Sequence, residues 1–295
     1  MRAAVVILNW NTREYLQRWL PALVQSCRGL DAGVVVADNA STDGSLELVR
    51  EQFPEVRTIA LDANYGFTGG YNRALAQIEA GYYVLINSDV DVVDGWLEPL
   101  LDWMDSHPDC GVCGPKLHAL GPGFEHTDRF EYAGAAGGRL TRHGFPWCRG
   151  RILSHTSRDR GKYSTCDSLK WVSGACLVTR SDLWRELGGL DERFFAHMEE
   201  IDYCWRARRR GWKVTCVCES TVWHLGGGTL PQGSPRKLLL NFRNSLLMLR
   251  NNAPSRVRMR LFLDRIIRLI YLLGGRKDAA QAVLQAHKEF KEMTI

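Results

Sequence analysis

The first part of the chain alternates short apolar runs with helical patterns. Uninterrupted apolar runs at residues 4–8, 34–37 and 82–86 predict strands that are buried on both faces. Between the first two runs, apolar residues recur at helical spacing from Thr12, which can cap a helix, to Val24. Buried strands that alternate with helices predict a parallel, doubly wound sheet over the first ~115 residues.

The middle of the chain departs from this pattern. Residues 116–166 mix Gly, His, Arg and aromatic residues without a clear period. Because this stretch is long for a structureless loop, we expect an extended insertion with short strands near the ligand site. A strand containing a glycine is predicted at residues 170–179, a helix begins near Met198, and a further strand ends at His224.

The last part of the chain is predicted to be helical. A helix beginning at Ser255 carries arginines interleaved with bulky apolar residues as far as Leu273, and a polar amphipathic helix follows at residues 278–293. Such a basic, apolar helix is typical of peripheral contact with an anionic membrane. Packing on the main domain or on a dimer partner is the alternative, and the sequence favours neither. We divide the chain into a main domain at residues 1–235 and a C-terminal helical extension at 236–295.

Composition and charge narrow the class of protein. The 295 residues are 45% hydrophobic and 24% charged, as in ordinary globular proteins. The net charge of +5 is modest and does not resemble a nucleic-acid stripe, so we expect no nucleic-acid partner. No stretch reaches the roughly 20 apolar residues of a spanning helix. Nine cysteines without a secretion signal indicate reduced thiols and a cytoplasmic location, at the inner face of the membrane if the basic helix binds lipid.

Polar side chains stand where three predicted strands end, at Asn9, Asp38 and Asp89. In open α/β sheets, ligands bind beyond the carboxyl ends of the strands. Asp89 and Asp91 are two apart in an extended segment and can converge on one object, and such carboxylates suit Mg²⁺ or Mn²⁺. A solvated acidic turn is the alternative. His224, at another strand end, is a metal ligand only if it faces these aspartates.

A second cluster of carboxylates opens the helix near Met198. Glu199, Glu200 and Asp202 lie in its first turn, where acids complement the helix dipole, and Asp202 can pair with Arg206 four residues on. Dipole compensation alone would explain these acids. The double glycine and the aromatic residues just before them indicate the mouth of a shaped pocket and favour a functional role.

Together these motifs resemble the inverting glycosyltransferases of family 2, and in particular their bacterial rhamnosyltransferase-like branch. The resemblance spans nearly the whole chain, from the strand before Asn9 to the helix that holds Arg243 and Asn244. It implies an α/β GT-A fold: a mostly parallel, doubly wound nucleotide-binding sheet with helices on both faces, plus the C-terminal helical extension. The implied reaction moves a sugar from a dTDP- or UDP-sugar to a glycan or lipid-linked acceptor in cell-surface polysaccharide or glycolipid assembly. An oligomer is compatible with the sequence.

The resemblance also implies roles for single residues. Glu200 falls on the position of the catalytic base, where Asp is commoner, with Glu199 and Asp202 as its neighbours in the catalytic set. Asp91 and His224 would hold the divalent metal. The acceptor would contact Trp171, Ala175 and His197. The donor would be bound by Asn9, Asn11, Asp38, Asn39, Ser41, Asn64, Gly66, Phe67, Asn72, Ser88, Asp89, Gly174, Arg243 and Asn244.

Two other classes of protein share some of these features. A nucleotidyltransferase acting on a sugar phosphate would also have a nucleotide-binding α/β half and acidic metal ligands. It usually has a Gly-rich, basic loop after the first strand, where this chain has residues 9–12, Asn-Trp-Asn-Thr. A non-catalytic nucleotide- or carbohydrate-binding module is disfavoured because metal ligands, a candidate base and pocket glycines occur together.

Overall fold

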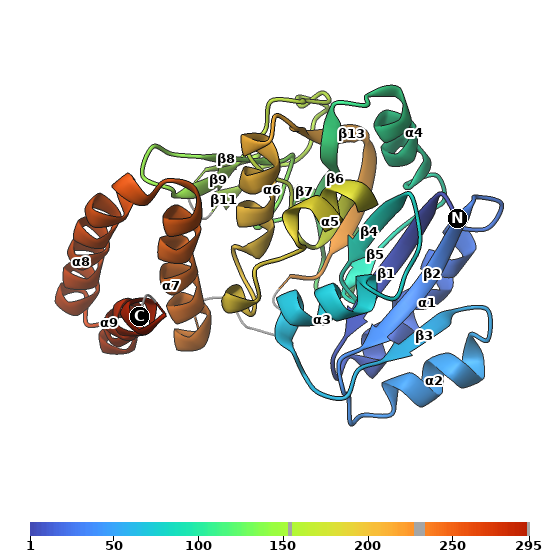
Figure 1. The fold of residues 1–295 in the computed structure, drawn as a ribbon, viewed down its shortest axis with the longest axis horizontal. Helices are drawn as coiled ribbons and strands as arrows, with labels where there is room; N and C mark the ends of the chain where they lie inside the picture. Colours follow the sequence, from blue (N-terminus) through green and yellow to red (C-terminus); the bar gives the residue numbers. More distant parts are fainter. Residues whose placement is uncertain (153–154, 227–233, 294–295) are drawn as a thin grey trace.

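The computed structural model describes residues 1–152, 155–226 and 234–293. Its centre is a mixed sheet with the strand order β3-β2-β1-β4-β12-β6-β13-β5, and β7 pairs with β6 (Figure 1). The strands of this sheet are β1 (Ala3–Asn9), β2 (Ala32–Asp38), β3 (Arg57–Ala60), β4 (Tyr82–Ile86), β5 (Val90–Asp91), β6 (Cys110–Leu120), β7 (His126–Phe130), β12 (Cys176–Arg180) and β13 (Lys213–His224).

The first four strands of the sheet form its parallel half. β3, β2, β1 and β4 are all parallel, as the apolar runs predict, and β13 is parallel to β6. β12 lies antiparallel between β4 and β6. It is shorter than the predicted strand, because residues 170–175 form a loop that leads into it.

Helices cover both faces of the sheet. Alternate residues of β1 enter two different apolar cores: Ala4 and Val6 pack with α3, α5 and α6, whereas Val5 and Ile7 pack with α1, α2 and α4. This alternation is the consequence of the two-residue period of a strand. The doubly wound architecture predicted from the sequence is therefore confirmed. These helices are α1 (Arg13–Ser26), α2 (Ser45–Gln52), α3 (Gly66–Leu75), α4 (Glu98–Ser106), α5 (Ser181–Leu187) and α6 (Glu199–Arg209).

The insertion between β6 and β12 contains short strands, as expected. Two small antiparallel ladders follow β7 in the chain, and both lie on the side of the sheet near the C-terminal helices (Figure 1). One pairs β8 (Gly138–Leu140) with β9 (Pro146–Cys148), and the other pairs β10 (Arg151–Ile152) with β11 (His155–Thr156).

Three helices form the C-terminal extension: α7 (Pro235–Asn252), α8 (Val257–Leu273) and α9 (Lys277–Glu292), with the 3₁₀ turn η2 (Pro254–Arg256) after α7. The C-terminal half of α7 packs into the main core through Leu247, Met248 and Leu249, so α7 ties the extension to the sheet domain. Its N-terminal half packs against α9 in a separate small core.

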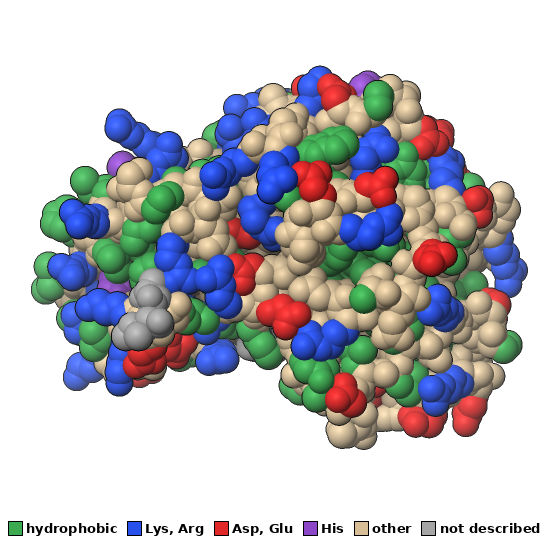
Figure 2. Space-filling model, viewed as in Figure 1, with side chains coloured by type: hydrophobic (Ala, Val, Ile, Leu, Met, Phe, Trp, Pro, Cys, Tyr) green, Lys and Arg blue, Asp and Glu red, His purple; other side chains and the backbone are tan. Residues whose placement is uncertain are grey.

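The outermost helix, α8, exposes apolar side chains. Seven of them are 42–81% exposed: Met259, Phe262, Ile266, Leu269, Ile270, Leu272 and Leu273. Figure 2 shows such hydrophobic side chains interleaved with Lys and Arg over the C-terminal helices at the left. Within the described ranges, no helix combines the length and the apolar character needed to cross a membrane.

Candidate active site

The ends of β1 and β2 carry a buried polar network built from predicted donor residues. The Nδ2 of Asn9 donates to Asp38 Oδ1 at 2.7 Å and to Ser41 Oγ at 3.0 Å. The backbone N–H of Ser41 donates to the second oxygen of Asp38 at 2.9 Å. Asn11, which is left-handed at φ 53°, accepts from the backbone of Thr42. The structure therefore brings Asn9, Asn11, Asp38 and Ser41 together at one edge of the sheet.

Thr12 joins this network to the end of β4. Its hydroxyl bonds Asn9 Oδ1 at 2.5 Å and Ser88 Oγ at 2.9 Å. The sequence predicts Thr12 as the cap of α1, but its hydroxyl is engaged here and makes no capping bond. Asp43 accepts the bond from the N–H of Arg13 instead, at 2.9 Å. A polar contact across strands has displaced the local cap.

The Gly-rich loop is shaped by Asn39, which donates to Asn64 Oδ1 and to the Gly66 carbonyl oxygen, both at 3.0 Å. Gly66 is left-handed at φ 68°, and a Cβ there would lie 2.4 Å from the Phe195 ring. Only glycine fits this close approach. Asn72 bonds the backbone N–H and carbonyl of Leu190 at 2.9 and 2.8 Å, so its amide joins α3 to the loop before α6.

An imidazole between two carboxylates forms the centre of the site. His224 Nε2 lies 3.2 Å from Asp89 Oδ1, and His224 Nδ1 lies 3.7 Å from Glu131 Oε1, with all three side chains 6–11% exposed. Burial lowers the pKa of His224, but Asp89 and Glu131 outweigh it and raise the pKa to about 10. Lys237 lies near the same carboxylates: burial lowers its pKa, and Glu131 and Asp89 oppose that shift. Four ionisable groups thus converge beyond the strand ends.

Asp91, the expected metal partner of His224, lies elsewhere. In the β5–β13 ladder Asp91 is opposite Trp223, and Val90 is opposite His224. Because neighbouring residues of a strand point to opposite faces, Asp91 and His224 are on different faces. The Asp91 carboxylate bonds His126 Nε2 at 2.8 Å, and the His126 ring stacks on Trp223 with centroids 4.0 Å apart. The structure brings His224 to Asp89 and not to Asp91. Over the described ranges, no group of three or more His, Cys, Asp or Glu side chains forms a ready metal cage.

Glu131 is a member of this cluster that the sequence analysis does not predict. It lies in the aperiodic insertion, just after β7, and is 5% exposed. Its Oε2 accepts a hydrogen bond from the backbone of Ala133. The insertion offers no strand or helix period that would place one acid inside, so only the pairing of β6 with β7 carries Glu131 to His224.

Two carboxylates, those of Glu199 and Glu200, begin α6. Among the described residues, the buried Oε2 atoms of Glu199 and Glu200 have no partner. Burial raises the pKa of Glu200 to about 7, although backbone N–H groups at the start of the helix oppose the shift. Burial and the neighbouring Glu200 charge raise the pKa of Glu199 well above its usual value. A Cβ on Gly174 would lie 3.4 Å from the Cβ of Glu200, so the 170–175 loop runs directly beside this carboxylate.

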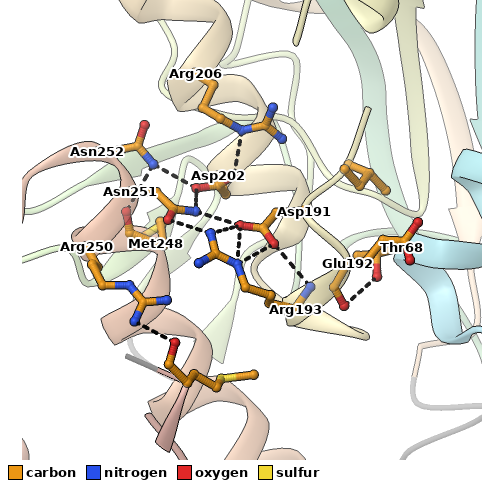
Figure 3. Close-up of polar contacts among 12 residues, drawn as sticks. Thr68, Asp191, Glu192, Arg193, Asp202, Arg206, Met248, Arg250, Asn251 and Asn252 are labelled. Atoms are coloured by element: carbon orange, nitrogen blue, oxygen red, sulfur yellow. Dashed lines mark hydrogen bonds and ion pairs between the residues drawn. The ribbon is translucent and has the colours of Figure 1, made fainter. Parts of the chain in front are cut away.

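Asp202, the third acid of the helix, is fully bonded to protein groups. Arg206 Nε donates to its Oδ2 at 2.7 Å, and Asn251 and Asn252 donate to its Oδ1 at 3.1 and 2.8 Å (Figure 3). Arg206 also donates to two loop carbonyls, those of Leu187 and Gly189. Asp202 is 0% exposed. Its bonds to Asn251 and Asn252 join α6 to the end of α7.

The predicted donor residues Arg243 and Asn244 contact the loop before α6. Asn244 Nδ2 donates to the carbonyl oxygens of Phe194, Ala196 and His197 at 2.7–3.0 Å. Arg243 donates to Phe194 O and forms an ion pair with Glu289 of α9 at 3.2 Å. Both side chains are at most 7% exposed. Their polar atoms hold the backbone that precedes Glu199 and Glu200.

The predicted acceptor residues lie around the same loop. The buried Nε2 of His197 has no hydrogen-bond partner among the described residues, and burial together with Lys237 lowers the pKa of His197 to about 4. Trp171 is 3% exposed, and its Nε1 donates to the Arg139 carbonyl at 3.1 Å. Ala175 is in the core, where its carbonyl accepts from Asn87. Of the three, His197 carries the unused polar atom.

The arrangement combines two chemical capacities. A carboxylate with a pKa near 7 can take a proton at neutral pH, which is the optimum for a general base. In the Asp89–His224–Glu131 cluster two carboxylates hold a proton on one imidazole, and a divalent cation that displaced this proton would be stabilised by the same carboxylates. The ends of β1 and β2 and the Gly-rich loop add further hydrogen-bonding groups.

A family model described as glycosyl transferase family 2 matches residues 4–176 of the chain. The chain is 29% identical over 231 residues to N-acetylglucosaminyl-diphospho-decaprenol L-rhamnosyltransferase of Mycobacterium tuberculosis, a match that covers 75% of each chain. It is 26% identical over 232 residues to the O-antigen biosynthesis protein RfbC of Myxococcus xanthus, covering 76% of this chain and 17% of that protein.

Solved structures share the fold at lower identity. GalNAc-T7 with UDP, GalNAc and Mn²⁺ superposes with a TM-score of 0.66 and 15% identity over 85% of this chain; the chain spans about half, 48%, of that protein. S. aureus TarS 1-349 with UDP-GlcNAc gives 0.62 and 15% over 98% of this chain and 80% of that one. The mannosyltransferase PcManGT of Pyrobaculum calidifontis, with GDP-Man and Mn²⁺, gives 0.58 and 14% over 97% and 75%. These likenesses confirm the expected GT-A-like architecture.

Proposed function

The chain belongs to glycosyl transferase family 2, and from this premise we propose that it transfers a sugar from a nucleoside diphosphate to an acceptor hydroxyl with inversion at the anomeric carbon. The observation that carries this proposal is the Glu200 carboxylate. It has an oxygen without a partner, a pKa near 7 and a position at the start of α6 beside Gly174. Those are the properties of a base that meets its proton donor only when substrate binds.

In the proposed reaction Glu200 accepts the proton of the acceptor hydroxyl. The hydroxyl oxygen attacks the anomeric carbon from the face opposite the diphosphate, the bond to the diphosphate oxygen breaks, and the configuration inverts. Removal of the proton as the bond forms contributes about 10²–10⁴-fold to such reactions. Burial and the adjacent Glu200 charge raise the pKa of Glu199 well above its usual value, so Glu199 holds its proton when Glu200 is ionised.

The donor nucleotide fits the network at the ends of β1 and β2. Asn9 and Ser41 hold the Asp38 carboxylate at the position where an open α/β sheet binds its ligand, which suits recognition of a base or ribose. Two structural neighbours were solved with a UDP- or a GDP-linked sugar, UDP-GlcNAc and GDP-Man. For this chain we propose a dTDP- or UDP-sugar as the donor class.

A divalent cation fits beside Asp89 better than beside Asp91. His224 Nδ1 is buried without a hydrogen-bond partner, and the imidazole is held between Asp89 and Glu131, two carboxylates that a divalent cation would balance once it displaces the imidazole proton. We propose that Asp89 and His224 hold Mg²⁺ or Mn²⁺ and that Glu131 orients the imidazole. Such an ion neutralises the charge that develops on a departing diphosphate. Lys237 would add a second positive charge on the same side.

We propose that the acceptor is bound at a membrane surface, because the burial pattern of α8 is the reverse of that of a usual surface helix. It buries its polar pair Arg260 and Asp264, which are 3% and 0% exposed and 2.7 Å apart, and it exposes its apolar stripe. A helix surrounded by water and protein normally buries the apolar side. The exposed apolar side of α8 therefore fits an apolar environment outside the protein.

Charge on α8 favours an anionic lipid surface over a second copy of the chain. At 3.6 residues per turn, the exposed Arg258 and Arg265 border the apolar stripe on one side. The only acid of the helix, Asp264, is buried in its ion pair. Two such faces would repel each other, whereas anionic headgroups would attract both. This fits a lipid-linked acceptor, which the name of the mycobacterial relative also carries, and a role in cell-surface polysaccharide or glycolipid assembly.

Product analysis tests the reaction class. The protein is incubated with Mn²⁺ and a panel of nucleoside diphosphate sugars, and release of nucleoside diphosphate is measured with and without acceptor lipids. We expect nucleoside diphosphate from one donor and a single anomeric product. Release of pyrophosphate from a nucleoside triphosphate and a sugar phosphate would instead identify a nucleotidyltransferase. Binding without turnover of every donor would identify a binding module.

A further inference from the structure

A cleft in the insertion collects positive charge outside the site described so far. It has a volume of about 740 Å³ and lies along the two small ladders β8–β9 and β10–β11. No acidic side chain of the described residues lines it. Six cationic side chains do: Arg139, Arg149, Arg151, Arg158, Arg160 and Lys162.

The protein supplies little countercharge to this cleft. Of the six cations, only Arg158 has an acidic partner among the described residues, Asp128 at 3.5 Å. Asp159, which sits in the chain between Arg158 and Arg160, is turned away and pairs with Lys116 at 2.6 Å. Like charges gathered in one cleft repel one another, so a multiply charged anion would stabilise the arrangement.

Several of the guanidinium groups are held in place. Arg151 donates to the Tyr132 carbonyl at 2.6 Å and stacks on the Tyr132 ring at 4.1 Å. Arg149 donates to the Ala136 carbonyl at 2.7 Å and lies over the Tyr163 ring at 5.3 Å. A planar guanidinium fork with a fixed orientation matches the oxygens of a phosphate group, and its preorganisation lowers the entropy lost on binding.

The cleft adjoins the proposed catalytic groups. Arg151 contacts the carbonyl of Tyr132, the residue after Glu131. Cys148 lines the cleft, and burial raises the pKa of its thiol to about 12, with further upward contributions from the Glu131 and Glu200 carboxylates. The thiol is thus within the electrostatic reach of the candidate base.

The other side of the cleft is attached to the membrane-facing helix. Arg260 of α8 donates to the carbonyl of Gly144 at 3.2 Å and lies 3.8 Å from the Phe145 ring centroid. Both residues belong to the turn that joins β8 to β9, and β9 provides Cys148 to the cleft. The hairpin therefore connects α8 to the cleft wall.

We infer that this cleft binds a phosphate or diphosphate ester that joins the acceptor sugar to its lipid. This rests on the proposed function for the identity of the acceptor, and it adds the chemical class of the group next to the accepting sugar. A lipid held at α8, an anionic linker in the cleft and a sugar hydroxyl at Glu200 would follow one another along the molecule. The cleft would then select acceptors by the phosphate group that links sugar to lipid, and the donor would bind at the strand ends.

Binding measured without turnover tests the inference. Titration calorimetry of the intact protein with inorganic pyrophosphate and with farnesyl diphosphate is done in chelator, so that a metal-bound diphosphate cannot occupy the donor site. We expect Arg160→Glu and Lys162→Glu each to weaken binding by at least about tenfold, because each replaces an attraction by a repulsion. Arg50→Glu, a charge reversal on the distant exposed face of α2, and Lys237→Gln, which removes the positive charge proposed for the donor side, should leave the affinity unchanged.

Each other outcome overturns the inference. Equal loss in Arg50→Glu would mean nonspecific attraction to a basic protein, and loss in Lys237→Gln would place the diphosphate in the donor site. If phosphatidylglycerol vesicles bind as tightly as vesicles of neutral lipid doped with a prenyl diphosphate, and Arg160→Glu weakens both equally, the cleft binds headgroups in general. Because the readout needs no donor sugar, it can succeed when nucleoside diphosphate release fails, and fail when that release succeeds.

Discussion

The side-chain amide of Asn244 donates a 2.7 Å hydrogen bond to the carbonyl oxygen of His197, a residue in the left-handed region at φ 71°. Phe195 and Met198 are also left-handed, at φ 64° and 71°. Such conformations in non-glycine residues cost on the order of 1–3 kcal/mol each and persist only when the surroundings hold them. Asn244 and Arg243 hold this loop by its carbonyls, and the loop places Glu199 and Glu200 at the start of α6.

Replacement of Asn244 should loosen that loop. We expect Asn244→Ala to lower the free energy of unfolding by about 2–3 kcal/mol, because the carbonyls of Ala196 and His197 lose this donor while that of Phe194 keeps only Arg243. Asn244→Asp should be at least as damaging, since a carboxylate has the same shape but cannot donate. Urea denaturation measures both. A stable Asn244→Ala protein with weakened nucleoside diphosphate binding would instead support the donor-binding role that the family resemblance implies.

Glu200→Gln should remove the base and keep the shape of the side chain. We expect kcat to fall about 10²-fold or more, with little change in donor affinity, because the donor is proposed to bind at the strand ends. Steady-state kinetics with the donor identified by the product assay gives both values. Glu200→Asp is the informative companion, since it restores the commoner family residue with a shorter reach and should keep partial activity.

Asp202→Asn is the matched control for Glu200→Gln on the same helix. Its carboxylate is fully bonded to Arg206, Asn251 and Asn252, so the variant should lose about 2–4 kcal/mol of stability through the unpaired Arg206. At a temperature where it stays folded, its turnover should remain. Abolished turnover in a folded Asp202→Asn protein, together with an active Glu200→Gln protein, would move the base two residues along α6.

The pKa of Glu200 gives a dependence on pH with a definite sign. The base works only when deprotonated, so kcat should rise with pH around a midpoint near 7. Stability should change in the opposite direction: the raised pKa means that the folded state binds the proton more tightly, so stability is lost as pH rises from about 4.5 to about 7. Glu200→Gln should therefore be more stable than the wild type at pH 8, by about 1–3 kcal/mol, and equal to it near pH 4. Thermal melts across this range would contradict the assignment if the two proteins showed identical profiles.

Asp89 and Asp91 form a natural pair for testing the cation site. We expect Asp89→Asn to abolish the Mn²⁺-dependent thermal stabilisation of the protein by UDP or dTDP, because it removes the carboxylate that faces His224. Asp91→Asn should retain it, since Asp91 bonds His126 on the other face of the ladder. The reverse pattern would support Asp91 as the ligand, as the family resemblance implies.

The exposed face of α8 predicts lipid binding that point variants can remove. Phe262→Ser combined with Leu269→Ser should abolish co-sedimentation with anionic liposomes while the fold remains, because both side chains are more than half exposed. Binding by the wild type should weaken as salt rises. Leu284→Ser, at a 42% exposed apolar position on α9, is the control and should bind normally. Wild-type dimers that dissociate in the double variant, without liposome binding, would show that a second copy covers this face.

The local patterns in the sequence determined much of this protein. Uninterrupted apolar runs predict strands buried on both faces, and the 3.6-residue period predicts the helices between them, because both patterns follow from backbone geometry alone. The same geometry puts Asn9, Asp38 and Asp89 at strand ends, and it places Glu199 and Glu200 in the first turn of a helix. These residues are near their partners in sequence or at the ends of regular elements, so short-range rules are sufficient.

Tertiary structure decided which of these side chains meet. The antiparallel register of β5 on β13 turns Asp91 toward His126 and leaves Asp89 to His224, and a shift of one residue would exchange the faces. Glu131 reaches His224 only through the irregular pairing of β6 with β7. The sequence also did not decide which side of α8 faces outward, since its arginines and apolar residues suit either orientation. It is the buried contacts of Arg260 with Asp264 and the β8–β9 turn that set its apolar side outward.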